Sequence, residues 1–147
     1  MLASRRAFLL LFLCAGYLAC RAKGDPVQET LDRVVRAAEK RDASAVVENL
    51  SAGYRDAVGQ SSAEVAAVLR RYFAAYEALD VKIQDFTVEK APEAARARFR
   101  VELSGRPTKL GGLDRLLPSA SRYDFDVRLA PEGGRWKVVW ASWLGAS

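Results

Sequence analysis

Three tyrosines and one aspartate have residue types and spacings that could support acid–base chemistry: Tyr54, Asp56, Tyr72 and Tyr76. A buried carboxylate near tyrosines has a raised pKa and can move a proton next to a carbonyl group. Tyr72 and Tyr76 are four residues apart, so on a helix their side chains would point the same way. The simpler interpretation, which we favour, is that the tyrosines pack in the core with their hydroxyls at its rim. Asp56 would then cap a turn.

A second set of candidate residues lies in residues 104–119, a long connection between two predicted strands. Long loops in compact domains are often lids or binding loops. A pair of glycines could hinge a short turn whose leucines face an apolar interior. A loop that stays in place and plugs one end of the domain explains the residues equally well. The sequence does not decide between a mobile lid and a static plug. The candidate residues are Gly111, Gly112, Leu113, Leu116 and Leu117.

Composition restricts the chemistry that these residues could perform. The 147 residues include no histidine, which is the commonest general base at neutral pH and the commonest metal ligand. The two cysteines, Cys14 and Cys20, both lie near the N-terminus, so no disulfide is expected inside the domain. We therefore expect no metal and no cofactor, and we favour binding over catalysis.

The N-terminal residues predict export. Arg5 and Arg6 precede a run of 13 apolar residues at 7–19. Crossing a bilayer takes roughly 20 residues, so the run is typical of a secretory signal peptide. Cys20 follows a small residue just past this run, which resembles the box at which bacterial lipoproteins are cleaved and acylated. The alternative is ordinary cleavage after Ala22, which would discard Cys20.

The leader also resembles a twin-arginine export motif at residues 4–9, SRRAFL. Two arginines suit the general export route as well, so the route stays open. By either route the protein is expected in the cell envelope, held at the membrane by its N-terminal lipid. We divide the chain into a signal peptide at 1–19, a lipidated tether at 20–25 and one domain at 26–147.

Helical spacing dominates the first half of the domain. Asp25 is the expected N-cap of a first helix that begins at Pro26. Asp42 is the expected N-cap of a short second helix. Residues 51–60, SAGYRDAVGQ, form a turn-rich link. Ser61 and Glu64 fit a capping box that opens a third helix, which is expected to run to about residue 78.

Strand-like alternation dominates the second half. In residues 94–105, Phe99, Val101 and Leu103 alternate with charged residues, which predicts a strand with one dry face. Further strands are expected at 81–90, 122–129 and 135–143, and the first should bend between Ile83 and Phe86. The order predicts an α+β domain with three N-terminal helices packed on a four-stranded antiparallel sheet.

The opposite face of this sheet is charged. Arg96, Arg98 and Arg100 would lie beside Asp124 and Asp126 of the next strand. Basic residues on a sheet suggest nucleic acid, but the interleaved acids favour cross-strand pairing on a solvated face. Without Arg5 and Arg6 the chain has 21 basic and 18 acidic residues, or +3. We therefore expect no nucleic-acid partner.

The order of elements resembles the nuclear transport factor-like superfamily, which includes SnoaL-like and ketosteroid isomerase-like proteins. The resemblance implies a cystatin-like cone with a curved sheet, often open at one end. No catalytic motif of a named enzyme branch can be carried over to this chain. The residues that carry the resemblance are the first helix, the step Arg41-Asp42-Ala43-Ser44-Ala45-Val46, the exit Asn49-Leu50-Ser51 to Tyr54, the helix at 61–76, and the strands ending in Trp136-Lys137-Val138-Val139.

These observations lead to two functional hypotheses. The first is an exported, lipid-anchored envelope protein whose cone binds a small apolar ligand or a partner without catalysis. The alternative is a cofactor-free isomerase, dehydratase or cyclase that uses tyrosine and aspartate. The last strand is apolar on both faces, so it lies inside the sheet or forms a homodimer. Its tryptophans, Trp136, Trp140 and Trp143, are expected in the core, although one could anchor a dimer.

Overall fold

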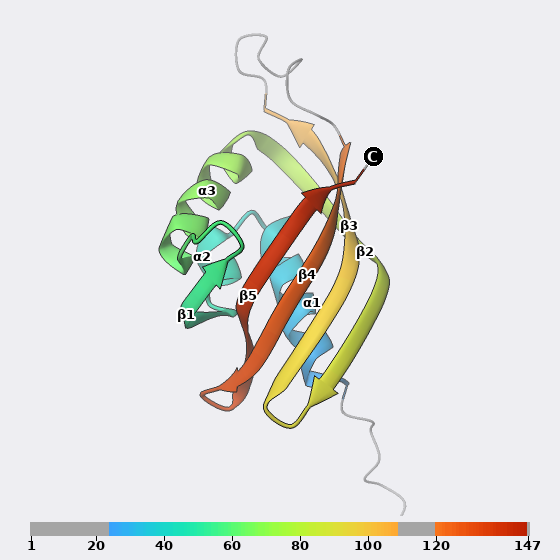
Figure 1. The fold of residues 1–147 in the computed structure, drawn as a ribbon. Helices are drawn as coiled ribbons and strands as arrows, with labels where there is room; N and C mark the ends of the chain where they lie inside the picture. The colour runs from blue at the N-terminus through green and yellow to red at the C-terminus, as the bar shows by residue number, and fades with distance from the viewer. Residues whose placement is uncertain (1–23, 109–119, 147) are drawn as a thin grey trace, which may run out of the picture.

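One curved sheet carries all the helices on one face (Figure 1). The computed structural model describes residues 24–108 and 120–146. The strands follow the order β1-β5-β4-β3-β2, in which β1 is parallel to β5 and the other neighbours are antiparallel. No helix within the described ranges is both long and apolar enough to cross a membrane. The elements are α1 (Pro26–Glu39), α2 (Ala43–Val47), β1 (Leu50–Asp56), α3 (Ser62–Ala74), β2 (Tyr76–Ala91), β3 (Ala94–Pro107), β4 (Ala120–Glu132) and β5 (Arg135–Gly145).

Side-chain caps start the three helices where the sequence predicts them. Asp25 accepts a hydrogen bond of 2.9 Å from the backbone N–H of Val27. Asp42 caps α2 in the same way, and Ser61 and Glu64 form the reciprocal capping box of α3. Each cap satisfies a backbone donor that has no partner inside its helix. The helix starts are therefore fixed by local chemistry.

The expectation of a four-stranded sheet is wrong, because the first half of the predicted turn-rich link is a strand. Strand β1 pairs with β5 through Arg55 opposite Trp140 and Asp56 opposite Ala141. The sheet therefore has five described strands, and a strand separates the second helix from the third. Residues 50–56, LSAGYRD, have little apolar alternation. Their pairing depends on β5, more than 80 residues away, which a local pattern cannot predict.

The boundary between α3 and β2 also differs from the prediction. The helix ends at Ala74 rather than near residue 78, and Tyr76 is the first residue of β2. Tyr76 pairs with Pro107, and its side chain is only 2% exposed. The predicted bend in β2 is confirmed by a register shift between Gln84 and Thr87, where Asp85 takes a φ of 53°.

The connection after β3 is shorter than predicted. Residues 104–107 are part of β3 and pair with the start of β2. The remaining candidates of this segment, from Gly111 to Leu117, lie outside the described residues, as does Cys20. The next turn is a two-residue hairpin of Gly133 and Gly134, both with positive φ. This conformation suits glycine and matches the twist of the flanking strands.

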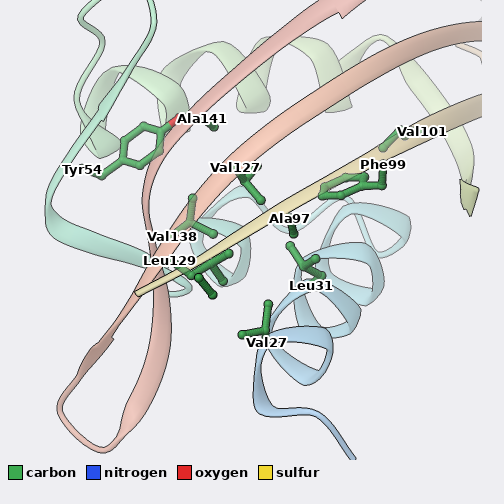
Figure 2. Close-up of a cluster of buried hydrophobic side chains, with 11 residues drawn as sticks. Val27, Leu31, Tyr54, Ala97, Phe99, Val101, Val127, Leu129, Val138 and Ala141 are labelled. Atoms are coloured by element: carbon green, nitrogen blue, oxygen red, sulfur yellow. The ribbon is translucent and has the colours of Figure 1, made fainter. Parts of the chain in front are cut away.

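The core has two parts. The first lies between α1 and the sheet, where Val27 and Leu31 point toward Ala97 and Leu129 (Figure 2). The second lies between the three helices and the start of β2, and includes Phe73 and Tyr76. A buried hydrogen bond of 2.8 Å from Thr30 Oγ1 to the carbonyl of Trp136 fixes α1 to β5.

The outer face of the sheet is charged and paired, as predicted. Arg96 donates two hydrogen bonds to Asp126, and Arg100 donates one of 2.9 Å to Asp124. These bonds join directly adjacent strands, and they lower the pKa of Asp126 below its ordinary value. Both arginines are therefore already paired with carboxylates of the same chain.

Candidate functional site

Four aromatic rings cross the concave face of the sheet, the face that carries the helices. We call Phe86, Phe99, Phe125 and Trp143 the aromatic ladder. Phe99 and Phe125 are 5.5 Å apart between ring centroids and nearly parallel, at 3°. Phe125 lies 5.9 Å from Trp143, and Phe86 lies 6.3 Å from Phe99. The sheet register explains the ladder, because Phe99 is directly opposite Phe125 and Phe125 is directly opposite Trp143.

Exposure increases along the ladder from Phe99 to Trp143. Phe99 is 8% exposed, Phe125 is half-buried and Trp143 is 39% exposed. Helix α3 contacts the sheet mainly at β1 and β2, which are its two edges. The helix therefore bridges the concave face, and its half-buried Val65 packs against the core that contains Phe99. Among the described residues, the ladder is an apolar floor that is less covered toward β5.

A pair of tyrosines lies in the second core, between α3 and the start of β2. The rings of Tyr72 on α3 and Tyr76 on β2 are 5.0 Å apart. Burial raises the pKa of Tyr72 first, and its interactions with Tyr76 and with Tyr123 of β4 raise it further. A tyrosine with a raised pKa stays protonated at neutral pH, so it can donate a hydrogen bond but does not act as a base.

Tyr54 and Asp56 form a separate pair on β1. Burial, followed by the charge of Asp56, raises the pKa of Tyr54 to about 12. Figure 2 shows the hydroxyl of Tyr54 beside Ala141 of β5. Asp56 is 4% exposed, and its Oδ1 accepts hydrogen bonds from the backbone N–H groups of Val58 (3.0 Å) and Gln60 (2.8 Å). One oxygen of Asp56 therefore holds the turn that leads to α3.

The other oxygen of Asp56 is unusual. Among the buried side-chain atoms of the described residues, Oδ2 of Asp56 is the one without a hydrogen-bond partner. A buried carboxylate oxygen that lacks a protein partner is costly, so it marks strain, a functional group or the site of a bound water molecule. The sequence prediction that Asp56 caps a turn explains Oδ1 but not Oδ2.

The structure brings the four predicted residues together as two pairs. Tyr72 and Tyr76 touch, although Tyr76 lies on a strand and not on the helix as predicted. Tyr54 belongs to the core between α1 and the sheet, whereas Tyr76 belongs to the core among the helices. Phe125 and Tyr123 lie in the strand predicted at 122–129, but they were not selected as candidates. The alternation of apolar and charged residues in this strand could have identified them. The register that pairs the strand with its neighbours cannot be read from the sequence.

The prediction that the tryptophans lie in the core is confirmed only in part. Trp136 and Trp140 are half-buried, whereas Trp143 is exposed at the end of the ladder. Lys90 lies over the ring of Trp136 at 5.4 Å, and Arg128 lies over Trp140 at 4.7 Å. These contacts use the tryptophan faces as cation–π partners within the domain.

The outer face carries a shallow groove of about 480 Å³ near the two hairpin turns. Glu89, Arg96, Arg128 and Val139 line it together with neighbouring residues of β2, β3 and β4. Its arginines are already engaged by Asp126 and Trp140. In the described part of the chain, no group of three histidine, cysteine or carboxylate side chains is arranged to hold a metal ion.

Comparisons with known proteins support the fold and nothing finer. No family model matches the sequence, and no curated protein matches it significantly. Many solved structures match in shape. A nuclear transport factor 2-like superfamily protein from Salmonella enterica has a TM-score of 0.67 at 14% identity, over 82% of this chain and 89% of that one. The fold is that of the nuclear transport factor-like proteins.

Two further structures with this fold carry enzyme names. A protein from Novosphingobium aromaticivorans, named provisionally as a scytalone dehydratase, has a TM-score of 0.72 at 9% identity over 83% of each chain. A hexachlorocyclohexane dehydrochlorinase, LinA type 2, has a TM-score of 0.66 at 8% identity over 83% of this chain and 84% of that one. The chain spans only 40% of Bd1075 from Bdellovibrio bacteriovorus, which also matches in shape. At these identities the likeness concerns the nuclear transport factor-like fold alone.

Proposed function

We propose that this protein is an exported, lipid-anchored component of the bacterial cell envelope whose cone binds a small apolar ligand without catalysis. Export is supported by Arg5 and Arg6 before the short apolar run at 7–19. Anchoring is supported by Cys20, which follows that run directly and is the last cysteine in the chain. The nuclear transport factor-like domain then works outside the cytoplasm.

The aromatic ladder is the observation that carries the binding function. A flat apolar molecule would stack on Phe125, which is half-buried, and on Trp143, which is the most exposed ring of the ladder. Aromatic pairs of this kind gain stability from offset stacking in addition to the buried area. The hydroxyls of Tyr72 and Tyr123 would hydrogen-bond a polar group at one edge of the ligand. The ligand class is therefore an aromatic or polycyclic molecule with few polar groups.

The protonation state of the tyrosines argues against a tyrosine as a catalytic base. Tyr54 and Tyr72 both have raised pKa values, so both are protonated at neutral pH. Protonated phenols orient a ligand but do not abstract its protons. The sequence offers no histidine as an alternative base. Asp56 is committed through Oδ1 to the turn before α3.

Anchoring is tested by replacing each cysteine in turn in the full-length protein. Cys20→Ser should move the domain from the membrane fraction to the soluble envelope fraction. Cys14→Ser is the matched control, because Cys14 lies inside the apolar run that cleavage would remove. Mass spectrometry should find the wild-type N-terminus at an acylated Cys20. An unmodified N-terminus beyond Cys20 would contradict anchoring.

One observation favours the enzyme alternative, a cofactor-free isomerase, dehydratase or cyclase. Oδ2 of Asp56 is buried without a partner, near a tyrosine whose pKa its charge helps to raise. Such a carboxylate could remove a proton next to a carbonyl. The probe is 2-tetralone in deuterated water, with α-proton exchange followed by NMR. Exchange that the wild type accelerates and Asp56→Asn does not would favour the enzyme, and equal rates for both would favour binding.

A further inference from the structure

The start of α1 lies beside both hairpin turns of the sheet. Asp25 forms an ion pair of 3.5 Å with Lys90, which is next to the β2–β3 turn. Lys90 in turn lies over Trp136, two residues beyond the β4–β5 turn. Figure 1 shows the same arrangement, with α1 beginning near the two turns. We call this end of the domain, defined by the turns at 92–93 and 133–134, the hairpin end.

The candidate binding residues lie toward the opposite end, which we call the ligand end. Tyr76 pairs with Pro107 where β3 finishes, and Tyr123 pairs with Gly145 where β5 finishes. Ala78 and Ala91 are 13 residues apart on β2, which corresponds to about 40 Å along the strand at roughly 3.3 Å per residue. The two ends of the domain are therefore separated by a large part of its length.

The chain between Cys20 and the hairpin end is short. Five residue steps separate Cys20 from Asp25, and even a fully extended chain spans only about 18 Å over that length. A lipid on Cys20 thus holds the hairpin end near the bilayer, whereas the ligand end extends well beyond the reach of the tether. We infer that the anchored domain stands with its hairpin end toward the membrane and takes its ligand from the aqueous side. This inference rests on the proposed acylation of Cys20.

The outer face of the sheet is not expected to bind the bilayer surface. The outer face carries ion pairs between its arginines and carboxylates, such as Arg96 with Asp126 and Arg100 with Asp124. A face with balanced charges gains little from an anionic lipid surface. The surface that could contact the bilayer in place of the hairpin end is the ligand end, where Trp143 is 39% exposed and Leu144 is 76% exposed. Insertion of these two side chains into the bilayer would require the domain to lie on its side.

Two matched cysteine variants of the full-length, lipidated protein test this orientation. Ala91→Cys marks the hairpin end and Ala78→Cys marks the ligand end, and both alanines are exposed residues of β2. Each introduced thiol is unique in the mature chain, since Cys20 is consumed by acylation. A small fluorophore on the thiol reports short-range energy transfer to an acceptor on the lipid headgroups of phosphatidylethanolamine–phosphatidylglycerol vesicles. The same variants carrying Cys20→Ser give the transfer expected without an anchor.

The inference predicts that energy transfer from position 91 is several-fold higher than from position 78. Equal transfer, or higher transfer from position 78, in protein that floats with the vesicles would overturn the orientation while leaving the anchor intact. Wild-type protein that does not float with the vesicles would refute the acylation of Cys20, and the orientation with it. Added 2-naphthol should leave the order of the two positions unchanged, because the tether and not the ligand sets it.

Discussion

The ring of Tyr76 packs directly on the backbone of Gly105. A Cβ atom on Gly105 would lie 2.7 Å from Cδ1 of Tyr76, and 3.0 Å from both the carbonyl oxygen of Ala78 and Cδ2 of Leu79. Such distances are too short for carbon contacts, so the tyrosine would have to move. Tyr76 is one of the largest fully buried side chains, and its ring supports that of Tyr72. Gly105 therefore positions two candidate binding residues.

Gly105→Ala should accordingly destabilise the domain by about 1–3 kcal/mol, the usual cost of overpacking a core. Gly53→Ala is the matched control, because a Cβ there would meet only Ser51 Oγ at 3.9 Å. Urea unfolding measures both changes. A Gly105→Ala variant as stable as Gly53→Ala would show that Tyr76 does not occupy this position.

Phe99 lies between two rings of the ladder: it stacks on Phe125, and the ring of Phe86 is tilted against it by 34°. Phe99→Ala should cost about 3–5 kcal/mol of unfolding free energy, because it leaves a cavity in a packed core. Arg98→Ala, on the outer face of the same strand, should cost less than about 1 kcal/mol, as is usual for exposed ion pairs. Similar losses for the two variants would mean that the faces of β3 are assigned wrongly.

The pair of Arg96 and Asp126 predicts a pH dependence of stability. Hydrogen bonds from Arg96 lower the pKa of Asp126 below its ordinary value of 3.8. The folded protein therefore binds this proton less tightly than the unfolded chain does. The stabilisation is complete above pH 3.8 and is lost as the pH falls through the lowered pKa. Asp126→Asn should thus be less stable than wild type at neutral pH.

The same comparison in acid provides the check on Asp126. The urea midpoints of wild type and Asp126→Asn, measured from neutral pH downward, should converge only as the pH falls through the lowered pKa of Asp126, which lies below 3.8, since the wild-type carboxyl then becomes neutral as well. Arg96→Gln should converge with wild type over the same range. A difference between variant and wild type that persists undiminished in acid would show that the ion pair is not its cause.

Tyr54 predicts the opposite dependence in alkali. Its folded-state pKa of about 12 exceeds the ordinary value of 10.0, so folding favours the protonated phenol. The corresponding stability is fully present below pH 10.0 and is lost as the pH rises through the folded-state pKa. Tyr54→Phe removes this loss, so the variant should unfold at a higher pH than wild type. Circular dichroism in alkali measures the midpoints, and identical midpoints would contradict the burial of the hydroxyl.

The sequence predicts the features that local chemistry controls. Asp25, Asp42 and Ser61 start helices because each side chain satisfies backbone donors a few residues away. The alternation around Phe99 identifies β3 and its dry face because a strand has a period of two. These predictions needed no knowledge of distant residues.

Features that depend on distant residues were not predicted. Strand β1 exists because Arg55 and Asp56 pair with Trp140 and Ala141 of β5. Tyr76 leaves the helix because pairing with Pro107 continues β2 to that point. The aromatic ladder likewise depends on the register of three strand pairs. The candidate site is built from these long-range contacts, which explains why its individual residues were found more readily than their grouping.

We propose above that the concave face between α3 and the middle strands binds an apolar aromatic ligand. Titration of the isotopically labelled protein with 2-naphthol, followed by NMR chemical shifts, tests this binding. We expect saturable shifts at Phe125, Trp143, Tyr72 and Tyr123, which Phe125→Ala abolishes while the outer-face variant Ser142→Ala retains them. Saturable shifts confined to the outer face around Trp140, or a response that Phe125→Ala leaves unchanged, would show that the ligand does not bind on the concave face.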